Sequence, residues 1–325
     1  MKLHSITAGI RIKSKLRRLA TLCLVLAILA SLIVACAPPA EEVPTFLLEV
    51  TDQAGRVVKL EKIPERIVSL APSNTEILFA LGLGDKVVGV TEYCNYPEAA
   101  KAKPKIGGFR TVDLEKTVAI EPDLIFATNI HKDEITPALE RLGLTVLTLD
   151  PRTLDEVLEA ITLTGKCTGK QEAASQLVTE MRNRIRVVTD KTDNLSEAQR
   201  PRVFYVMWHE PLQTVGSHTR IHELIGLAGG VNIAQDLGEG YPTISLEAVI
   251  QANPQVIIAG SGMGEGADLP FQYASTESRL KDADARINNR VYEIYTDLVG
   301  RPGPRFVEAL EQLAEMIHPE LFTSD

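Results

Sequence analysis

The chain has 325 residues, of which 45% are hydrophobic and 24% are charged, and its formal net charge is −9. An acidic chain argues against nucleic acid as a partner, because contacts to phosphate groups need clustered lysine and arginine side chains. The length is sufficient for two domains of ordinary size, each with its own core.

The N-terminus predicts an export signal. Residues 1–18 contain six basic residues and no acidic one, and residues 19–35 are almost wholly apolar. A basic stretch followed by an apolar stretch is typical of such signals, and this apolar stretch is slightly short for a membrane span of about 20 residues. Removal of residues 1–35 would shift the net charge from −9 to −15, since six positive charges leave with no negative one.

The residues before Cys36 favour a cleaved signal over an uncleaved anchor, which is the alternative. Ile33-Val34-Ala35-Cys36 resembles the bacterial lipoprotein signal, in which cleavage precedes a cysteine that is then acylated. We therefore expect residues 1–35 to be a lipoprotein signal peptide and residues 36–55 to form a tether and entry segment. Lipid on Cys36 would hold the protein at the outer face of the cytoplasmic membrane, which is periplasmic where the host has an outer membrane.

The remaining chain contains two cysteines, Cys94 and Cys167. One disulfide between them suits an oxidising compartment, and two buried free thiols suit the sequence equally well. No CxxC pair is present, so the usual spacing of a cysteine metal site is missing.

Short apolar strands alternate with helices in the first half of the chain. We predict strands over residues 66–70, 86–90, 124–127 and 145–149. Residues 75–82 predict a helix that Ser73 or Asn74 caps. Strands separated by helices indicate βαβ units and a largely parallel sheet.

The second half follows the same plan, with a strand over residues 202–208 and a helix over residues 221–230. The clearest internal match is between DLEKTVAIEPDLIFA at residues 113–127 and SLEAVIQANPQVIIA at residues 245–259. Each segment has Leu-Glu, an apolar helical stretch, a proline seven residues after the glutamate, and a buried strand. Two such copies indicate a duplicated lobe, whereas a repeat array would need three or more.

A long amphipathic helix separates the two halves. Apolar side chains recur every three or four positions from Ala173 to Val188, which predicts one helix joining two lobes. The resulting domains are a first α/β lobe over residues 56–167, a bridging helix over residues 168–195 and a second α/β lobe over residues 196–325. A cleft between two such lobes is a usual place for ligands.

Five segments carry a resemblance to a known family. RIVSLAPSNTEILFALGLGDKVVGVTEYCNYP, GGFRTVDLEKTVAIEPDLIFA, the bridging helix, YPTISLEAVIQANPQVIIAG and YTDLVGRPGPR occur in the order seen in periplasmic binding proteins for cobalamin, iron-siderophores and haem. The resemblance extends from Pro64 to the C-terminus, and the cobalamin-binding members are the most similar. It implies two Rossmann-like α/β lobes bridged by one helix, the class III solute-binding fold. It also implies no enzymatic activity, no resident cofactor, and a monomer that hands a corrinoid to an ABC importer permease dimer with its ATPase subunits.

The resemblance gives roles to particular residues. Glu115 and Glu247 match the surface glutamates, one per lobe, that dock into arginine pockets of the permease, although a glutamate at a helix start is also favoured by the helix dipole alone. Tyr93, Phe109 and Tyr241 match positions that line the ligand cleft, where Phe109 and Tyr241 replace tryptophans of the cobalamin-binding members. These aromatic side chains offer flat contact area for a macrocycle. The further candidate ligand contacts are Trp208 at a strand end, Asp297 as an acceptor for corrin amides, and Arg301 as a donor.

Other ligands and functions leave different patterns. Aromatic and amide-pairing groups favour a corrinoid, whereas several basic cleft residues would favour an anionic ferric siderophore. The alternative is the same transport role for an iron-siderophore or haem. A metal-capture protein would use His218 and His222, which are four residues apart but lack an HExxH pattern; His131 and His209 are single histidines that could approach a metal centre. No GxSxG, Walker A or strand-linked GxGxxG motif occurs, so the sequence predicts no enzyme.

Overall fold

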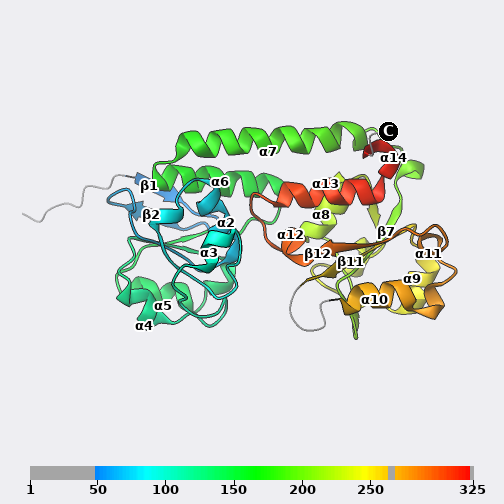
Figure 1. Ribbon diagram of the computed structural model, residues 1–325, viewed down its shortest axis with the longest axis horizontal. Helices are drawn as coiled ribbons and strands as arrows, with labels where there is room; N and C mark the ends of the chain where they lie inside the picture. The colour runs from blue at the N-terminus through cyan, green and yellow to red at the C-terminus, as the bar shows by residue number, and fades with distance from the viewer. Residues whose placement is uncertain (1–47, 263–267, 323–325) are drawn as a thin grey trace, which may run out of the picture. The chain divides into compact units, whose positions relative to one another are not determined.

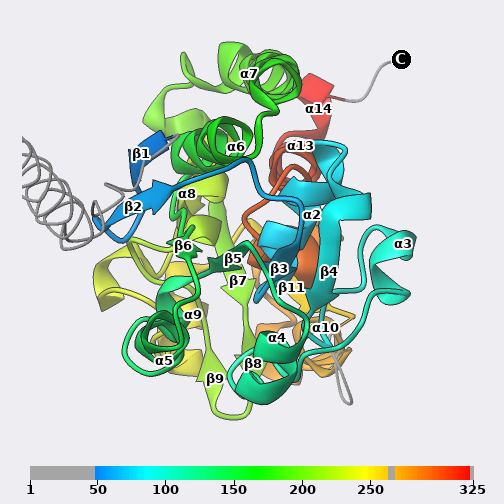
Figure 2. The ribbon, with the colours of Figure 1, turned by 90° about the vertical axis from the view of Figure 1, so that its left-hand side faces the viewer.

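The computed structural model describes residues 48–262 and 268–322. The predicted signal peptide and Cys36 lie outside the described residues. Phe46–Asp325 forms one compact unit, and its described residues build two α/β lobes (Figures 1 and 2). The predicted two-lobe fold is confirmed.

The first lobe is built on a four-stranded parallel sheet in the order β4-β3-β5-β6. Its strands are short and buried on both faces because helices or loops cover each side, which explains the continuous apolar runs in the sequence. An antiparallel hairpin, β1-β2, precedes this sheet, and β1 falls inside the predicted entry segment. The elements of this lobe are β1 Leu48–Thr51, β2 Val57–Leu60, β3 Ile67–Ser69, α2 Pro72–Ala80, β4 Val87–Val90, α3 Glu98–Lys101, α4 Leu114–Ala119, β5 Leu124–Ala127, α5 Ile135–Arg141, β6 Val146–Thr148 and α6 Leu154–Thr168.

The second lobe repeats the same sheet order. Its parallel sheet runs β10-β7-β11-β12. In both four-stranded sheets, the strand that comes first in the sequence therefore lies between the second and the third. A small antiparallel pair, β8-β9, follows β7, so the predicted strand over residues 202–208 is interrupted. The elements are β7 Arg202–Val206, β8 Trp208–His209, β9 Leu212–Gln213, α8 Arg220–Leu227, β10 Val231–Asn232, α9 Leu246–Ala252, β11 Val256–Ser261, α10 Leu269–Thr276, α11 Asp284–Ile287, β12 Val291–Tyr295, α12 Thr296–Gly300, α13 Phe306–Ile317 and α14 Pro319–Phe322.

The helix α7, Gln171–Thr192, runs along both lobes (Figure 1). It packs on α6 of the first lobe and on α13 of the second. Arg184 of α7 donates two hydrogen bonds, of 2.8 and 2.6 Å, to the carboxylate of Glu311 in α13. This two-point bond fixes the direction of the guanidinium as well as its distance, so α7 is tied firmly to the second lobe.

The predicted cap of the first helix is wrong. The helix α2 begins at Pro72, its N-cap is Ala71, and no side chain caps it. Proline suits the first helical position because its missing N–H would have no partner there. Asn74 instead lies inside the helix and donates to the carbonyl of Ala127 at the end of β5.

A buried network of charges joins the lobes beneath the cleft. Glu76 of α2 accepts two hydrogen bonds, of 2.9 and 2.6 Å, from Arg305 at the start of α13. Arg301 lies 3.7 Å from Glu76 and 2.7 Å from Asp297, and it donates to the side chain of Asn95. Burial raises the pKa of Glu76 above its ordinary value, while the hydrogen bond and charge of Arg305 oppose that rise. The network therefore depends on both partners being present in a dry site.

Replacement of Glu76 by glutamine is expected to lower the free energy of unfolding by about 3–5 kcal/mol, because Arg305 then stays buried without its counter-charge. Urea titration at pH 7 measures the loss. Glu65→Gln is the matched control, since Glu65 pairs with Lys86 at 2.9 Å but is 68% exposed. That exposed pair contributes about 0–1 kcal/mol. Equal losses for the two variants would contradict the structural role given to the network.

A second contact between the lobes is sensitive to pH. Glu223 of α8 accepts a hydrogen bond of 3.0 Å from the backbone N–H of Leu154, at the start of α6. Burial raises the pKa of Glu223 to about 7, against the lowering effect of that hydrogen bond, and the nearby charges of Asp155 and Glu156 add to the rise. Between about pH 4.5 and about pH 7, Glu223 is therefore protonated in the folded protein and ionised in the unfolded chain.

We expect the free energy of unfolding to fall as pH rises from about 4.5 to about 7, because only the folded state binds this proton in that range. Glu223→Gln should remove this part of the pH dependence, with a gain on the order of 1–2 kcal/mol at pH 8 after solvent screening is allowed for. Urea titrations of the wild type and the variant at pH 5 and pH 8 measure the free energy of unfolding. The exposed Glu159→Gln serves as the control, and an unchanged pH slope in Glu223→Gln would refute the assignment.

Candidate ligand-binding cleft

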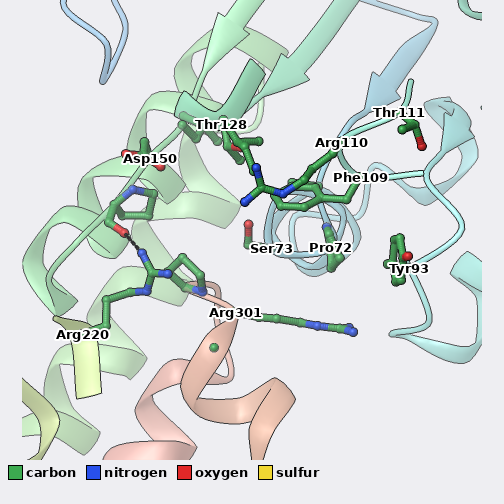
Figure 3. A pocket seen from close by; sticks show the side chains of 16 residues that line it. Pro72, Ser73, Tyr93, Phe109, Arg110, Thr111, Thr128, Asp150, Arg220 and Arg301 are labelled. Carbon is green, nitrogen blue, oxygen red and sulfur yellow. Dashed lines mark hydrogen bonds between the residues drawn. The ribbon is translucent and has the colours of Figure 1, made fainter. Parts of the chain in front are cut away.

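A cavity of about 680 Å³ lies between the two lobes (Figure 3). Most of its lining comes from the first lobe, and Arg220, Gly300, Arg301 and Pro302 come from the second. Another cavity, of about 770 Å³, is lined by first-lobe residues alone and includes no aromatic side chain. The cavity between the lobes is therefore the better candidate for a ligand site.

The first lobe presents the carboxyl ends of its sheet to this cavity. Ser73 follows β3, Tyr93 follows β4, Thr128 follows β5 and Asp150 follows β6, and all four line the cavity. In open parallel sheets, ligands bind outside the carboxyl ends of the strands because loops of adjustable chemistry meet there. The sheet order thus accounts for the placement of the site.

Phe109 and Arg110 reach the cavity from a tight loop. The loop closes between Gly107 and Val112, which form an antiparallel bridge, and the N–H of Gly108 donates to the carbonyl of Thr111. Gly107 has φ of +99°, and a Cβ there would lie 2.6 Å from the oxygen of Thr111. Only glycine suits this position, so the Gly-Gly pair creates the turn that presents Phe109.

His131 supports Phe109 from inside the lobe. Its Nδ1 accepts a hydrogen bond of 3.1 Å from the N–H of Thr128, so the ring proton is on Nε2, which lies 2.7 Å from the carbonyl oxygen of Phe109. The two rings also meet edge to face, with centroids 5.4 Å apart. His131 is 1% exposed, and burial lowers its pKa. Since both ring nitrogens are already bonded within the lobe, His131 holds the backbone of Phe109 and is not placed to bind a metal centre.

Three arginines give the cavity a basic character. Figure 3 shows Arg110, Arg220 and Arg301 entering from three different segments. Arg220 donates to the carbonyl of Pro151 at 3.2 Å, and Arg301 is held by Asp297. Arg110 is exposed. Asp150 is the acidic residue among those lining the cavity, so the described lining favours an anionic or strongly hydrogen-bond-accepting ligand.

The structure brings some of the predicted ligand contacts together and leaves others apart. Tyr93, Phe109 and Arg301 line the cavity. Asp297 is 4% exposed, is not among the residues that line the cavity, and pairs with Arg301 at 2.7 Å. Trp208, whose Nε1 donates to the carbonyl of Glu210, and Tyr241, which is 49% exposed, are not among the residues that line it. Their contact with a ligand remains a prediction.

Arg110 and Arg220 were not among the predicted site residues. Arg110 directly follows Phe109, so the loop for which the sequence predicted an aromatic ligand contact also contains this arginine. Arg220 is the first residue of α8, one position before the predicted helix start. The residue before it, Thr219, caps the helix and accepts from the N–H of His222. A capping threonine was the local signal for this start.

His218 and His222, the residues considered for metal capture, are exposed and half-buried respectively. No cluster of three or more His, Cys, Asp or Glu residues suited to a metal occurs within residues 48–262 and 268–322. His218 is 74% exposed and lies 3.9 Å from Glu239, whereas His222 packs beside Asn232. Cys94 and Cys167 are buried free thiols, and burial raises the pKa of Cys167 to about 11.

Glu115 and Glu247 lie away from this cavity, near the starts of α4 and α9. Both side chains are exposed. Within the described part of the chain, no helix combines the length and the apolar character that crossing a bilayer requires.

Comparison with known proteins agrees with this architecture. Residues 67–298 match the sequence model of the family described as "Periplasmic binding protein", and the chain belongs to this family. The "Uncharacterized ABC transporter substrate-binding lipoprotein YvrC" of Bacillus subtilis (strain 168) is 33% identical over 306 residues, which cover 90% of this chain and 95% of that protein.

Among the similar solved structures, two each match 79% of this chain. The periplasmic vitamin B12 binding protein BtuF of Vibrio cholerae is 31% identical, is covered to 98% and superposes with a TM-score of 0.68. The periplasmic heme-binding protein RhuT from Roseiflexus sp. RS-1, in apo form, is 27% identical, is covered to 99% and has a TM-score of 0.68. The chain is thus a substrate-binding protein of an ABC transporter, related to B12- and haem-binding proteins. Proteins of this family are non-enzymatic transport components that work with a permease and an ATPase.

The role of His131 leads to a test by pH. At pH 7.5, His131→Asn should lower the free energy of unfolding by about 1–2 kcal/mol, because the donor to the carbonyl of Phe109 is lost. Below about pH 6.5 the unfolded histidine takes up a proton that the folded one resists, so the wild type loses stability with acid and the gap to the variant should narrow.

Urea titrations at pH 7.5 and 5.5 measure both effects. His218→Asn is the matched control, since His218 is exposed and has φ of +58°, a conformation that asparagine tolerates. A gap between the wild type and His131→Asn that is the same at both pH values would show that His131 is not held neutral by the lobe.

Proposed function

We propose that the chain is a lipid-anchored solute-binding protein that captures a corrinoid, cobalamin, and delivers it to an ABC importer. The observation that carries this proposal is the aromatic edge of the cavity, where Tyr93 and Phe109 stand on loops at the carboxyl ends of the first sheet. Phe109 is fixed from behind by His131. A rigid aromatic ring offers apolar contact to a flat macrocycle without losing much side-chain entropy. The similarity to the vitamin B12 binding protein of Vibrio cholerae supports the same ligand.

The anchor is proposed from the sequence and from one relative. Ile33-Val34-Ala35-Cys36 has the pattern of a lipoprotein signal, and the Bacillus subtilis relative is named a lipoprotein. Acylation of Cys36 would keep the protein at the outer face of the membrane, close to its importer. We place Glu115 and Glu247 at the contact with the permease, one from each lobe, and we expect the protein to act as a monomer.

The arginines of the cavity favour a second ligand class. Arg110, Arg220 and Arg301 suit the carboxylates of haem or the oxygens of an anionic iron-siderophore, because a guanidinium binds such groups through two donors. The similarity to the heme-binding protein of Roseiflexus is consistent with haem. The two candidate ligands differ in their acidic groups: haem carries two carboxylates, whereas cobalamin carries one phosphodiester.

Isothermal titration of the chain lacking residues 1–36 with cyanocobalamin, haemin and a ferric hydroxamate tests the ligand. We expect cyanocobalamin to bind with a Kd below about 1 μM and Phe109→Ala to weaken it at least tenfold, through loss of the stacking surface. Phe322→Ala, an aromatic change in α14, is the control and should leave the Kd unchanged.

Arg110→Gln and Arg220→Gln distinguish the alternatives. If haemin is the ligand, each change should weaken it about tenfold by removing a charge-assisted bond, while cyanocobalamin should be less affected. Binding of haemin or the hydroxamate alone would keep the transport role and reject the corrinoid. Binding of none of the three would reject both ligand classes.

A further inference from the structure

The segment that carries each exposed glutamate is repeated in more detail than the sequence match alone indicates. The positions 132 residues apart have the same structural roles in the two lobes. Asp113 and Ser245 cap α4 and α9, each accepting from the backbone N–H three residues on. Just past the helices, Glu121 and Asn253 both have φ of +45°. The two lobes therefore share one local structure around Glu115 and Glu247.

An exposed aliphatic side chain accompanies each glutamate. Val118 is 38% exposed and Ile250 is 43% exposed, and each lies three positions after the glutamate of its helix. Residues three apart are neighbours on one helix face. By contrast Thr117 and Val249, the equivalent positions just before them, are buried against their lobes. The same outward face thus holds a carboxylate next to an apolar side chain in both lobes.

An arginine holds the end of each helix. Arg66, just before β3, donates through Nε and Nη2 to the carbonyl of Ile120, at 3.1 and 2.6 Å, and through Nε to that of Glu121. Arg202, at the start of β7, donates through Nε to the carbonyls of Ala252 and Asn253, at 2.9 and 3.1 Å, and through Nη2 to that of Asn253, at 2.8 Å. The last carbonyls of a helix have no partner within it, so these arginines satisfy them and tie both helices to their sheets.

The two helices lie on the same side of the protein. In both views α4 and α9 lie in the halves of their lobes that are away from α7 (Figures 1 and 2). They are therefore free of the helix that joins the lobes. A partner that approaches from this side meets two similar surfaces, one from each lobe.

We propose that each lobe docks through a pair of side chains, Glu115 with Val118 and Glu247 with Ile250, and not through the glutamate alone. The partner is the permease dimer, and this inference rests on the proposed transport function. The surface fits two symmetry-related recesses, each with a basic group beside an apolar wall. The charge gives direction and rate to the encounter, whereas the apolar contact lengthens the life of the complex.

The environment of the two glutamates is similar but not identical. Next to Glu115, Lys116 lies 3.3 Å from Asp113 and so is directed toward the helix start. Beside Glu247, Arg279 lies 3.9 Å away and also hydrogen-bonds to Glu277 at 3.1 Å. Both cations have closer partners than the docking glutamates, so the two carboxylates remain available to a cationic partner.

The test uses the full-length, lipid-bearing chain in proteoliposomes with the permease–ATPase complex of the host's vitamin B12-class importer. The readout is the concentration of binding protein that gives half-maximal stimulation of ATP hydrolysis. Val118→Gln with Ile250→Gln should raise this concentration at least tenfold. Val187→Gln is the matched control, because Val187 is a 59% exposed aliphatic residue on α7, and it should have no effect.

Two further measurements separate this inference from the proposed function. Isothermal titration of each variant with cyanocobalamin and haemin should show ligand affinity within twofold of the wild type, which excludes misfolding. If Glu115→Gln with Glu247→Gln raises the half-maximal concentration while the Val118 and Ile250 double variant does not, the apolar part is overturned and the docking role of the glutamates stands. If neither double variant changes the stimulation, both the inference and the proposed docking surface fail.

Discussion

The buried bond between Glu76 and Arg305 is the constraint on which the cleft depends. Removal of two charges from water costs several kcal/mol per ion, and their attraction repays this only when the geometry is good and other bonds are satisfied. Here the carboxylate receives two bonds from one guanidinium, and the ring of Tyr96 lies 3.8 Å from that guanidinium on the opposite lobe. Such a pair contributes little net stability compared with apolar packing. Its effect is to penalise any arrangement of the lobes in which one partner is left alone, and so to select one geometry.

Arg301 connects this network to the candidate cleft. This residue belongs to the network, through Asp297 and Glu76, and also lines the cavity. Its guanidinium is therefore held from behind before any ligand arrives, as the backbone of Phe109 is held by His131 on the other side. Groups that are already ordered lose less entropy when a ligand binds. Different interactions thus order the two walls of the cleft. A network of charges holds Arg301 on one side, and a neutral histidine holds the backbone of Phe109 on the other.

The features that were predictable from sequence are local, and those that were missed depend on distant residues. The apolar runs at β3, β4, β5 and β7 predicted strands because parallel strands are buried on both faces, and the order of strands and helices predicted two α/β lobes. Glu76 and Arg305 are 229 positions apart, and no spacing rule joins them. The contact of Glu223 with the N–H of Leu154 is equally remote. The predicted cap of α2 was wrong because Ser73 and Asn74 are residue types that cap helices well, but the helix already begins at Pro72.

In the first lobe, the candidate ligand cleft and the proposed docking surface are close in sequence. Phe109, at the cavity, and Glu115, on α4, are six positions apart, and the N–H of Asp113 donates to the carbonyl of Ile106 at the base of the same loop. The loop that presents Phe109 and the helix that presents Glu115 therefore share backbone bonds. In the second lobe Tyr241 and Glu247 have the same spacing, but Tyr241 does not line the cavity. A ligand that displaces the Phe109 loop has to displace the start of α4 with it, whereas α9 has no such link through the cavity. The coupling between ligand and partner is for this reason expected to be stronger in the first lobe than in the second.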